Sequence, residues 1–515
     1  MKLRSIVQLS AIFLLLVSRV SLSAAITHVS ERKNPTAPDY VLLNGEIVQE
    51  GNPCRVDGNV HNFNTPLLRL MRTKSEKPLG TVLLIPGGGY EILKMKNEGE
   101  NGAMFFNNEN YDVAILEYHI HSGEQTRDLA LTDALQAFRL LRTSLKSIGL
   151  RSDRLSIVGI SSGGHLAART VQKLGDKEQP EDLILISPEY LDETTTGTVF
   201  PAVMPPINPT ARLFTTFSSN DKKAWIYRAE EYTKTWIGYD GWGSFRLLSD
   251  STYLSEMDTN PFDSKLELPG VLKTFLETKP ETAKPSVNPA AVPVEGYSPK
   301  RHAAKLELVA KEKFDLLMIG NSITNNFEKP EYQPVWNQFF APRRALNLGY
   351  SGYRTENIIW NIQHGELEGQ SPKVVVLEIG TNNVDEKHYP TRHTAGQLAG
   401  GIEAIVKILR EKLPDTKIIV LRCFPGCYGG PNPTSHRAIL ERASDIVSKL
   451  ADGKHIFYCD VNHVFLNTDG SINHAMMPDW LHPSPAGAKA WAQAMEPLLS
   501  KLMGDKSLDT DIPSN

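Results

Sequence analysis

From about Tyr40 onward, short apolar runs typical of buried strands alternate with longer segments whose apolar residues recur at helical spacing. An order of strand, helix, strand, helix favours a largely parallel sheet covered by helices. We therefore predict an α/β protein. At 515 residues, the chain is long enough for two or three domains.

One segment interrupts the alternation. Leu276 to Arg301 contains five prolines and almost no apolar periodicity, which indicates an extended linker. The sequence therefore predicts a first domain over 40–276, a linker over 277–300 and a second domain over 301–504. The last residues, 505–515, are predicted to form a polar tail.

The first 24 residues have the pattern of a secretory signal peptide. Lys2 and Arg4 precede an apolar core from about Ile12 to Val17, and small residues follow it. A membrane anchor is the alternative, but this core is well short of the roughly 20 residues that span a bilayer. We expect a secreted or periplasmic protein without stable membrane insertion. The net charge of −4 and the pI near 6.4 give no general attraction to nucleic acid.

Export would allow a disulfide bond, but the four cysteines are too few for a disulfide scaffold. Cys423 and Cys459 each lie in or next to a strand-like run, so a bridge from Cys459 to Cys423 or to Cys427 is one interpretation. Buried free thiols are the other.

A first serine motif lies in the N-terminal half. Gly159 to Gly163 reads G-I-S-S-G between a strand pattern and a helix pattern, which is the setting of a nucleophile elbow. Together with Pro86-Gly87-Gly88-Gly89, it resembles the α/β-hydrolase superfamily, and specifically its carbohydrate-esterase and feruloyl-esterase-like members. The resemblance implies three roles: a nucleophile at Ser161, a triad acid at Asp221, and oxyanion N–H donors in the loop with Gly88 and Gly89.

The base of this first triad is missing. The superfamily places its histidine after the acid, and no histidine occurs between Asp221 and Arg301. His165 follows Ser161 by one helical turn, and His119 and His121 precede it, so none has the expected position. A serine without a base is a poor nucleophile. We expect a degenerate domain, retained for packing or for sugar binding.

The second half carries four polar blocks just beyond predicted strand ends. They are Gly320-Asn321-Ser322, Gly352, Gly380-Thr381-Asn382-Asn383, and the pair Asp479 and His482. Open α/β sheets build their sites at that edge.

The blocks together resemble the SGNH or GDSL hydrolase superfamily, most closely the catalytic subunits of platelet-activating-factor acetylhydrolase and their bacterial relatives. The resemblance implies a three-layer α/β/α domain of flavodoxin-like type. It makes Ser322 the nucleophile, His482 the base and Asp479 its orienting acid. Its oxyanion hole would be the N–H groups of Ser322 and Gly352 and the amide of Asn382. The superfamily usually has aspartate where this chain has Asn321, so hydrogen bonding in that loop is expected to differ.

The predicted reaction is hydrolysis of a small acyl ester, acetyl foremost, through an acyl-enzyme that needs no cofactor. Export and the carbohydrate-esterase-like partner domain favour an O-acylated polysaccharide as substrate. A phospholipid acetylhydrolase or lipase is one alternative, and a non-catalytic glycan-binding or scaffold protein is another. His463, His474 and Asp460 fit no metal-ligand spacing, so no metal is expected. The sequence leaves the oligomeric state open.

Overall fold

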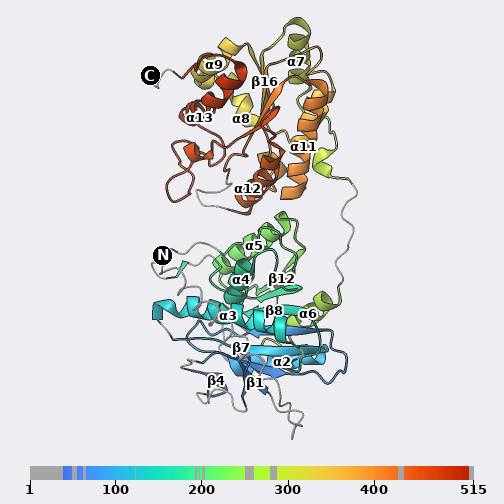
Figure 1. The fold of residues 1–515 in the computed structure, drawn as a ribbon, viewed down its shortest axis with the longest axis vertical. Coiled ribbons are helices and arrows are strands. Elements are labelled where there is room, and N and C mark those ends of the chain that lie inside the picture. The colour runs from blue at the N-terminus through green and yellow to red at the C-terminus, as the bar shows by residue number, and fades with distance from the viewer. Residues whose placement is uncertain are drawn as a thin grey trace, which may run out of the picture. The chain divides into compact units, whose positions relative to one another are not determined.

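The computed structural model of the protein describes residues 39–48, 55–61, 65–121, 123–145, 147–191, 194–195, 198–199, 203–249, 260–278, 287–426 and 434–509. The predicted signal peptide, Cys54, Cys427 and residues 510–515 lie outside these ranges. The chain divides into two compact units, Met1–Thr233 with Trp242–Pro280, and Lys234–Gly241 with Glu281–Asn515. Both are α/β, which confirms the predicted fold class (Figure 1).

The first unit is built on a nine-stranded sheet in the order β13-β12-β9-β8-β6-β7-β5-β1-β2. The strands from β13 to β7 are parallel, and β5, β1 and β2 add antiparallel pairs at one edge. Every residue of β6, β7, β8, β9 and β12 is buried, as expected of parallel strands covered on both faces. The strands of this unit are β1 (Asp39–Leu42), β2 (Ile47–Val48), β3 (Arg55–Val56), β4 (Asn59–Val60), β5 (Leu67–Met71), β6 (Gly80–Ile85), β7 (Tyr111–Glu117), β8 (Leu155–Ile160), β9 (Asp182–Ile186), β10 (Thr194–Thr195), β11 (Thr198–Val199), β12 (Arg212–Ser218) and β13 (Gly243–Leu248). The α-helices that accompany them are α2 (Asn101–Asn108), α3 (Thr126–Ser144), α4 (Ser162–Leu174), α5 (Lys223–Gly238) and α6 (Glu267–Glu277).

The second unit contains a five-stranded parallel sheet in the order β15-β14-β16-β17-β18. This is the flavodoxin-like order, and it reverses direction beside β14, where such sheets bind their ligands. The strands are β14 (Leu316–Gly320), β15 (Ala345–Gly349), β16 (Val374–Glu378), β17 (Lys417–Leu421) and β18 (Ile456–Cys459). The α-helices are α7 (Pro299–Lys311), α8 (Ser322–Asn325), α9 (Gln333–Phe339), α10 (Thr355–Gln363), α11 (Ala395–Lys412), α12 (Ser435–Val447) and α13 (Pro485–Met503).

Two apolar cores cover the two faces of this sheet. Alternate residues of β14 belong to different cores, with Leu317 and Ile319 in one and Leu316 and Met318 in the other. The first core includes residues of α7, α10, α11 and α12, and the second includes residues of α9 and α13. Figure 1 shows α7 and α11 on one side of β16 and α9 and α13 on the other, so the unit has three layers.

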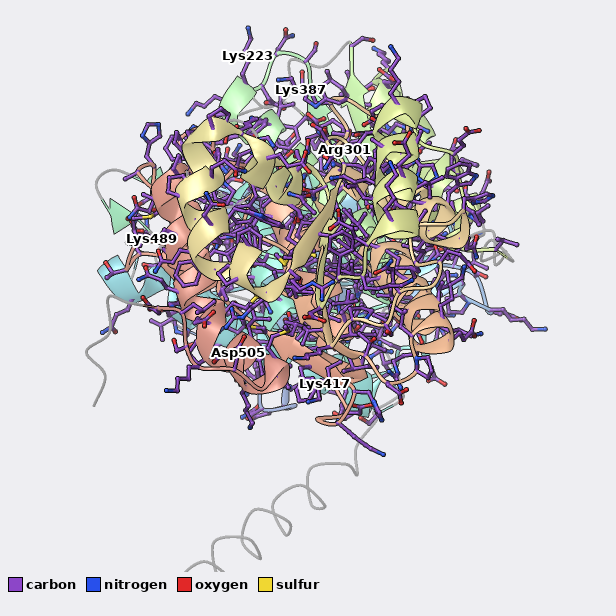
Figure 2. All side chains as sticks on the ribbon, turned by 90° about the horizontal axis from the view of Figure 1, so that it is seen from above. Lys223, Arg301, Lys387, Lys417, Lys489 and Asp505 are labelled. Carbon is purple, nitrogen blue, oxygen red and sulfur yellow. The ribbon has the colours of Figure 1, made fainter. Side chains whose placement is uncertain are left out.

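The tail and the linker differ from their predictions. We predicted a polar tail over 505–515, but hydrogen bonds attach the start of this segment to the second unit. The Arg343 guanidinium donates to Asp505 at 2.8 Å, and the N–H of Leu508 donates to Glu496 at 2.7 Å. Figure 2 labels Asp505 beside the salmon-coloured ribbon of the C-terminal part of the chain.

The linker prediction extends too far toward the C-terminus. Within 277–300, the side chain of Asn288 donates to the Gln397 carbonyl at 2.8 Å, and the Ala290 carbonyl accepts from Thr355 Oγ1 at 2.7 Å. Tyr297 donates to the Ser351 carbonyl at 3.1 Å. These bonds make the segment from Asn288 part of the second unit. The sequence did not indicate this, because the segment contains prolines and has little apolar periodicity.

Cys423 and Cys459 are free thiols, so the bridge considered between them does not form. Cys423 is buried, and burial raises the pKa of its thiol to about 11. Among the described helices, none combines the length and the apolar character that crossing a membrane requires.

Candidate active site

Ser322 begins α8 directly after β14, in a turn that three backbone or side-chain bonds hold. Asn321 Oδ1 accepts from the N–H of Ile323 at 2.8 Å and caps the short helix. On the β15 side, Asn347 Nδ2 donates to the Thr324 carbonyl at 2.8 Å, and the N–H of Tyr350 donates to the Gly320 carbonyl at 2.9 Å. The Ser322 hydroxyl is thereby presented at the carboxyl edge of the sheet.

Asp479 and His482 come from one tight loop before α13. Asp479 Oδ1 accepts from the N–H of Leu481 at 3.0 Å and of His482 at 2.7 Å, while Trp480 between them has φ 63°. After the loop, the Pro483 carbonyl accepts from the Tyr332 hydroxyl at 2.8 Å. The loop is therefore fixed on both sides of the imidazole.

The three side chains predicted for the C-terminal site are joined by hydrogen bonds, although 160 residues separate Ser322 from His482. Ser322 Oγ lies 2.9 Å from His482 Nε2, and His482 Nδ1 lies 2.7 Å from Asp479 Oδ2. Burial alone would raise the pKa of Asp479, but the hydrogen bonds from His482 lower it to about 2. An ionised Asp479 makes Nδ1 the protonated nitrogen at neutral pH, so Nε2 is free to accept the serine proton.

The other two blocks lie in adjoining loops. Gly352 has φ 78°, a conformation that favours glycine, and its carbonyl accepts from the Tyr389 hydroxyl. Asn382 Nδ2 donates one of its two N–H bonds to the Tyr353 carbonyl at 2.9 Å. The second N–H of this amide is not used by that bond, so the side chain keeps a donor for a substrate oxygen.

A cavity of about 410 Å³ opens over the serine and histidine. Its wall includes Ser322, Asp479 and His482, while Gly352 and Asn382 are not among the lining residues. Sequence reasoning missed the rest of the wall, which combines five polar residues with three prolines. These further residues are Asn326, Lys329, Tyr332, Ser351, Pro478, Pro483, Ser484 and Pro485.

In the first unit, Ser161 has the backbone geometry of a nucleophile elbow. Ser161 has φ 54° and ψ −124°, the strained turn that an elbow requires, and only 4% of the residue is exposed. A hydrogen bond links its side chain to the Glu189 carboxyl, whose pKa burial raises. Asp221 is bonded to its own loop and to a neighbouring one, because Oδ2 accepts from the N–H of Ser218 at 2.9 Å and from Ser187 Oγ at 3.1 Å.

The histidines considered as substitutes are engaged elsewhere. His119 bonds to Asp133 at 2.7 Å, His121 to Glu91 at 2.9 Å and His165 to the Tyr90 hydroxyl at 2.7 Å. None of these bonds includes Ser161.

Two N–H donors of the glycine loop are also taken. Gly87 N–H donates to the buried Glu98 carboxyl at 2.6 Å, and Gly89 N–H donates to Ser162 Oγ at 2.9 Å. Gly88 between them has φ 128°, and its carbonyl accepts from two backbone N–H groups of its own loop. Of the two predicted oxyanion donors, Gly89 could therefore serve only by giving up its bond to Ser162.

Comparison with known proteins places the second unit in a family. The GDSL-like lipase/acylhydrolase family model matches residues 318–490. Platelet-activating factor acetylhydrolase IB subunit alpha1 of Pongo abelii is 34% identical over 190 residues, which are 37% of this chain and 77% of that relative. This chain belongs to the GDSL-like lipase/acylhydrolase family. The beta-subunit homolog of Drosophila melanogaster is 31% identical over 199 residues, 38% of this chain and 83% of its own. This GDSL-like acylhydrolase is therefore a carboxylic ester hydrolase, as predicted.

The first unit of the GDSL-like protein matches a different family model, BD-FAE, over residues 70–199. The predicted likeness of this half to α/β-hydrolases is thus confirmed. Among solved structures, the acetyl ester-xyloside bifunctional hydrolase from Caldicellulosiruptor lactoaceticus has a TM-score of 0.35 at 17% identity. The match covers 47% of this chain and 98% of that structure.

A buried carboxyl behind Ser322 also escaped sequence reasoning. Glu378 ends β16 and is 2% exposed. The one available signal was an acidic residue that closes an otherwise apolar strand, Val374–Glu378, shortly before Gly380.

No cluster of three or more metal-ligating side chains occurs within the described ranges.

Proposed function

We propose that this GDSL-like acylhydrolase is a secreted esterase that removes small acyl groups, acetyl foremost, from a polysaccharide. Ser322, His482 and Asp479 carry the reaction. The observation that supports this most directly is the chain of two hydrogen bonds, 2.9 Å from Ser322 Oγ to His482 Nε2 and 2.7 Å from His482 Nδ1 to Asp479.

In the first half of the reaction, His482 Nε2 takes the proton of Ser322 as the hydroxyl oxygen attacks the ester carbonyl carbon. The carbonyl oxygen becomes negative, and the N–H groups of Ser322 and Gly352 and the amide of Asn382 donate to it. The imidazolium then gives its proton to the leaving alcohol oxygen. The C–O bond breaks, and the acyl group remains on Ser322.

In the second half, water replaces the alcohol. His482 Nε2 takes a proton from this water, whose oxygen attacks the acyl carbon, and the same proton returns to Ser322 Oγ as the acid leaves. Asp479 stays ionised throughout, since its pKa lies at about 2, and it stabilises each imidazolium that forms. The cycle uses side chains of this unit and water.

The substrate proposal has three supports. The named relatives are acetylhydrolases, which favours a small acyl group. Most of the residues that line the cavity are polar, which suits a polar alcohol such as a sugar. The signal-like N-terminus and a first unit that resembles carbohydrate esterases favour an enzyme that works outside the cell on polysaccharides.

A phospholipid acetylhydrolase is the second candidate, because the relatives carry platelet-activating factor in their names. An acetate-release panel separates the two. Acetylated xylan, acetylated pectin and a short-chain acetyl phospholipid are each incubated with the enzyme. We expect acetate from a polysaccharide at the higher kcat/KM, and a preference for the phospholipid would contradict the polysaccharide proposal.

The assignment of the site is tested by p-nitrophenyl acetate hydrolysis with the wild type, Ser322→Ala and Ser161→Ala. We expect Ser322→Ala to lose at least about a thousandfold in kcat, because its nucleophile is gone. Ser161→Ala serves as the matched control, since both changes remove one hydroxyl after a strand, and it should stay within about twofold. The reverse pattern would move the active site to the first unit. N-terminal sequencing of the exported protein tests secretion, with a start near Ala24 or Ala25 expected.

A further inference from the structure

Asn321 and Glu378 lie on neighbouring strand ends directly behind Ser322. In the parallel pair of β14 and β16, Gly320 is opposite Glu378. Asn321, which lies between Gly320 and Ser322, therefore comes one position after the residue that pairs with Glu378. Asn321 is 0% exposed and Glu378 is 2% exposed. Both side chains therefore need partners inside the protein.

The bonds of Asn321 fix which end of its amide meets Glu378. Asn321 Oδ1 accepts from the N–H of Ile323 at 2.8 Å, so its Nδ2 donors point to the other side. Among the described residues, the buried atoms Asn321 Nδ2 and Glu378 Oε2 have no hydrogen-bond partner at ordinary distance and angle. The Asn321 side chain is nevertheless near enough to lower the pKa of the Glu378 carboxyl, so the two groups are neighbours.

The surroundings of Glu378 favour its neutral form. Burial raises the pKa of this carboxyl to about 8, although the neighbouring Asn321 side chain acts in the opposite direction. No ion pair to Glu378 occurs in the described part of the chain. The titratable neighbour is Cys423 on the β17 side, and burial keeps that thiol neutral as well by raising its pKa to about 11. The space behind the nucleophile thus holds a carboxylic acid and an amide without a charge.

We propose that Glu378 is a positioning residue, whose neutral carboxyl accepts a hydrogen bond from Asn321 Nδ2 and thereby holds the turn that presents Ser322 to His482. The bond complements the one from Asn347 to the Thr324 carbonyl on the opposite side of the same turn. This role rests on the proposed function, because the turn matters for catalysis only if Ser322 is the nucleophile.

The pair also gives a physical reason for asparagine before the serine. An aspartate at position 321 could cap Ile323 equally well, but its second oxygen would then face the Glu378 carboxyl. Two carboxyls in contact cannot both ionise, and one must hold a proton that both share. Asparagine supplies a donor at that position instead.

A reciprocal swap tests the proposal in the full-length chain. The variants are Asn321→Asp, Glu378→Gln and the double variant, which exchanges the acid and the amide between the two positions. We expect Asn321→Asp to lower kcat on p-nitrophenyl acetate at least about tenfold. In the double variant, the amide introduced at position 378 can donate to the carboxylate introduced at position 321, so kcat should recover to within about threefold of Glu378→Gln. Glu378→Met is the matched control of similar length without an acceptor, and it should fall at least about fivefold below Glu378→Gln.

Three readouts separate positioning from folding. Each variant is measured for kcat, for KM and for the rate at which a fluorophosphonate labels Ser322, alongside its melting temperature. Recovery of kcat and labelling in the double variant supports the proposal. Equal kcat in Glu378→Met and Glu378→Gln, or recovery of the melting temperature without recovery of labelling, would overturn it. Full activity of Ser322→Ala in the same assay would refute the proposed function instead, and the two failures are therefore distinct.

Discussion

Replacement of Glu378 by glutamine should stabilise the second unit by an amount that grows with pH. Glutamine keeps the size and an acceptor for Asn321 but cannot ionise. The wild-type carboxyl has a pKa of about 8 in the folded protein, raised by burial, and the ordinary value of 4.5 applies once the chain unfolds.

The sign follows from proton binding. Below pH 4.5 both states hold the proton, and the contribution of the group to stability is complete. Between pH 4.5 and 8 the folded state keeps a proton that the unfolded state has lost, so the wild-type free energy of unfolding falls as pH rises. The slope is about 1.4 kcal/mol per pH unit, which amounts to roughly 5 kcal/mol across the window. Above pH 8 the difference becomes constant.

Urea unfolding with a short deuterium pulse measures this in the intact chain. Peptides that cover β16 report the second unit separately from the first, and the wild type and Glu378→Gln are compared at about pH 5, 6, 7 and 8, across the window that the two pKa values define. Glu496→Gln is the matched control, because Glu496 is equally buried but paired with Arg343, and this change should destabilise the unit. A Glu378→Gln difference that stays flat with pH, or that shrinks as pH rises, would refute a neutral buried Glu378.

Three further changes have expected outcomes. Asp479→Asn should lower kcat about 10⁴-fold with folding intact, because the imidazole of His482 loses the carboxylate that sets its tautomer. Asn382→Ala should lower kcat by about 10² to 10³ and leave KM within about threefold, as expected for an oxyanion donor, and an effect on KM alone would contradict that role. Glu496→Ala removes one partner of a buried 2.7 Å ion pair and should destabilise the second unit by about 3–5 kcal/mol in the same urea experiment; an effect below ~1 kcal/mol would contradict it.

The features that could be predicted from the sequence are those with local signals. Apolar runs such as the one before Ser322 indicate parallel strands wherever they occur, and polar residues just after them lie at one sheet edge because parallel strands share direction. The α/β class follows from that regularity, whereas the esterase family was indicated by the resemblance of the four polar blocks to a known superfamily. The same reasoning grouped Ser322, Asp479 and His482, which the structure joins by hydrogen bonds.

The features that could not be predicted depend on partners far away in the chain. Glu378 stands out in the sequence only as one acid after four apolar residues, and its contact with Asn321 arises from strand register. Likewise, the donors of Gly87 and Gly89 are taken by Glu98 and Ser162, a fact of geometry that a G-G-G motif does not encode. The local sequence pattern predicts helices and strands. The contacts between those helices and strands decide which polar groups remain free to bind a substrate.

The attachment of Tyr297 determines where this protein can be divided. Its hydroxyl donates to the Ser351 carbonyl beside Gly352, and the N–H of the next residue, Ser298, donates to the Tyr353 hydroxyl at 3.1 Å. A recombinant second half that begins at Arg301 would lack both bonds, and with them the support of the loop that carries Gly352. A fragment that begins near Val287 keeps them, so modular exchange of the two halves belongs upstream of that residue.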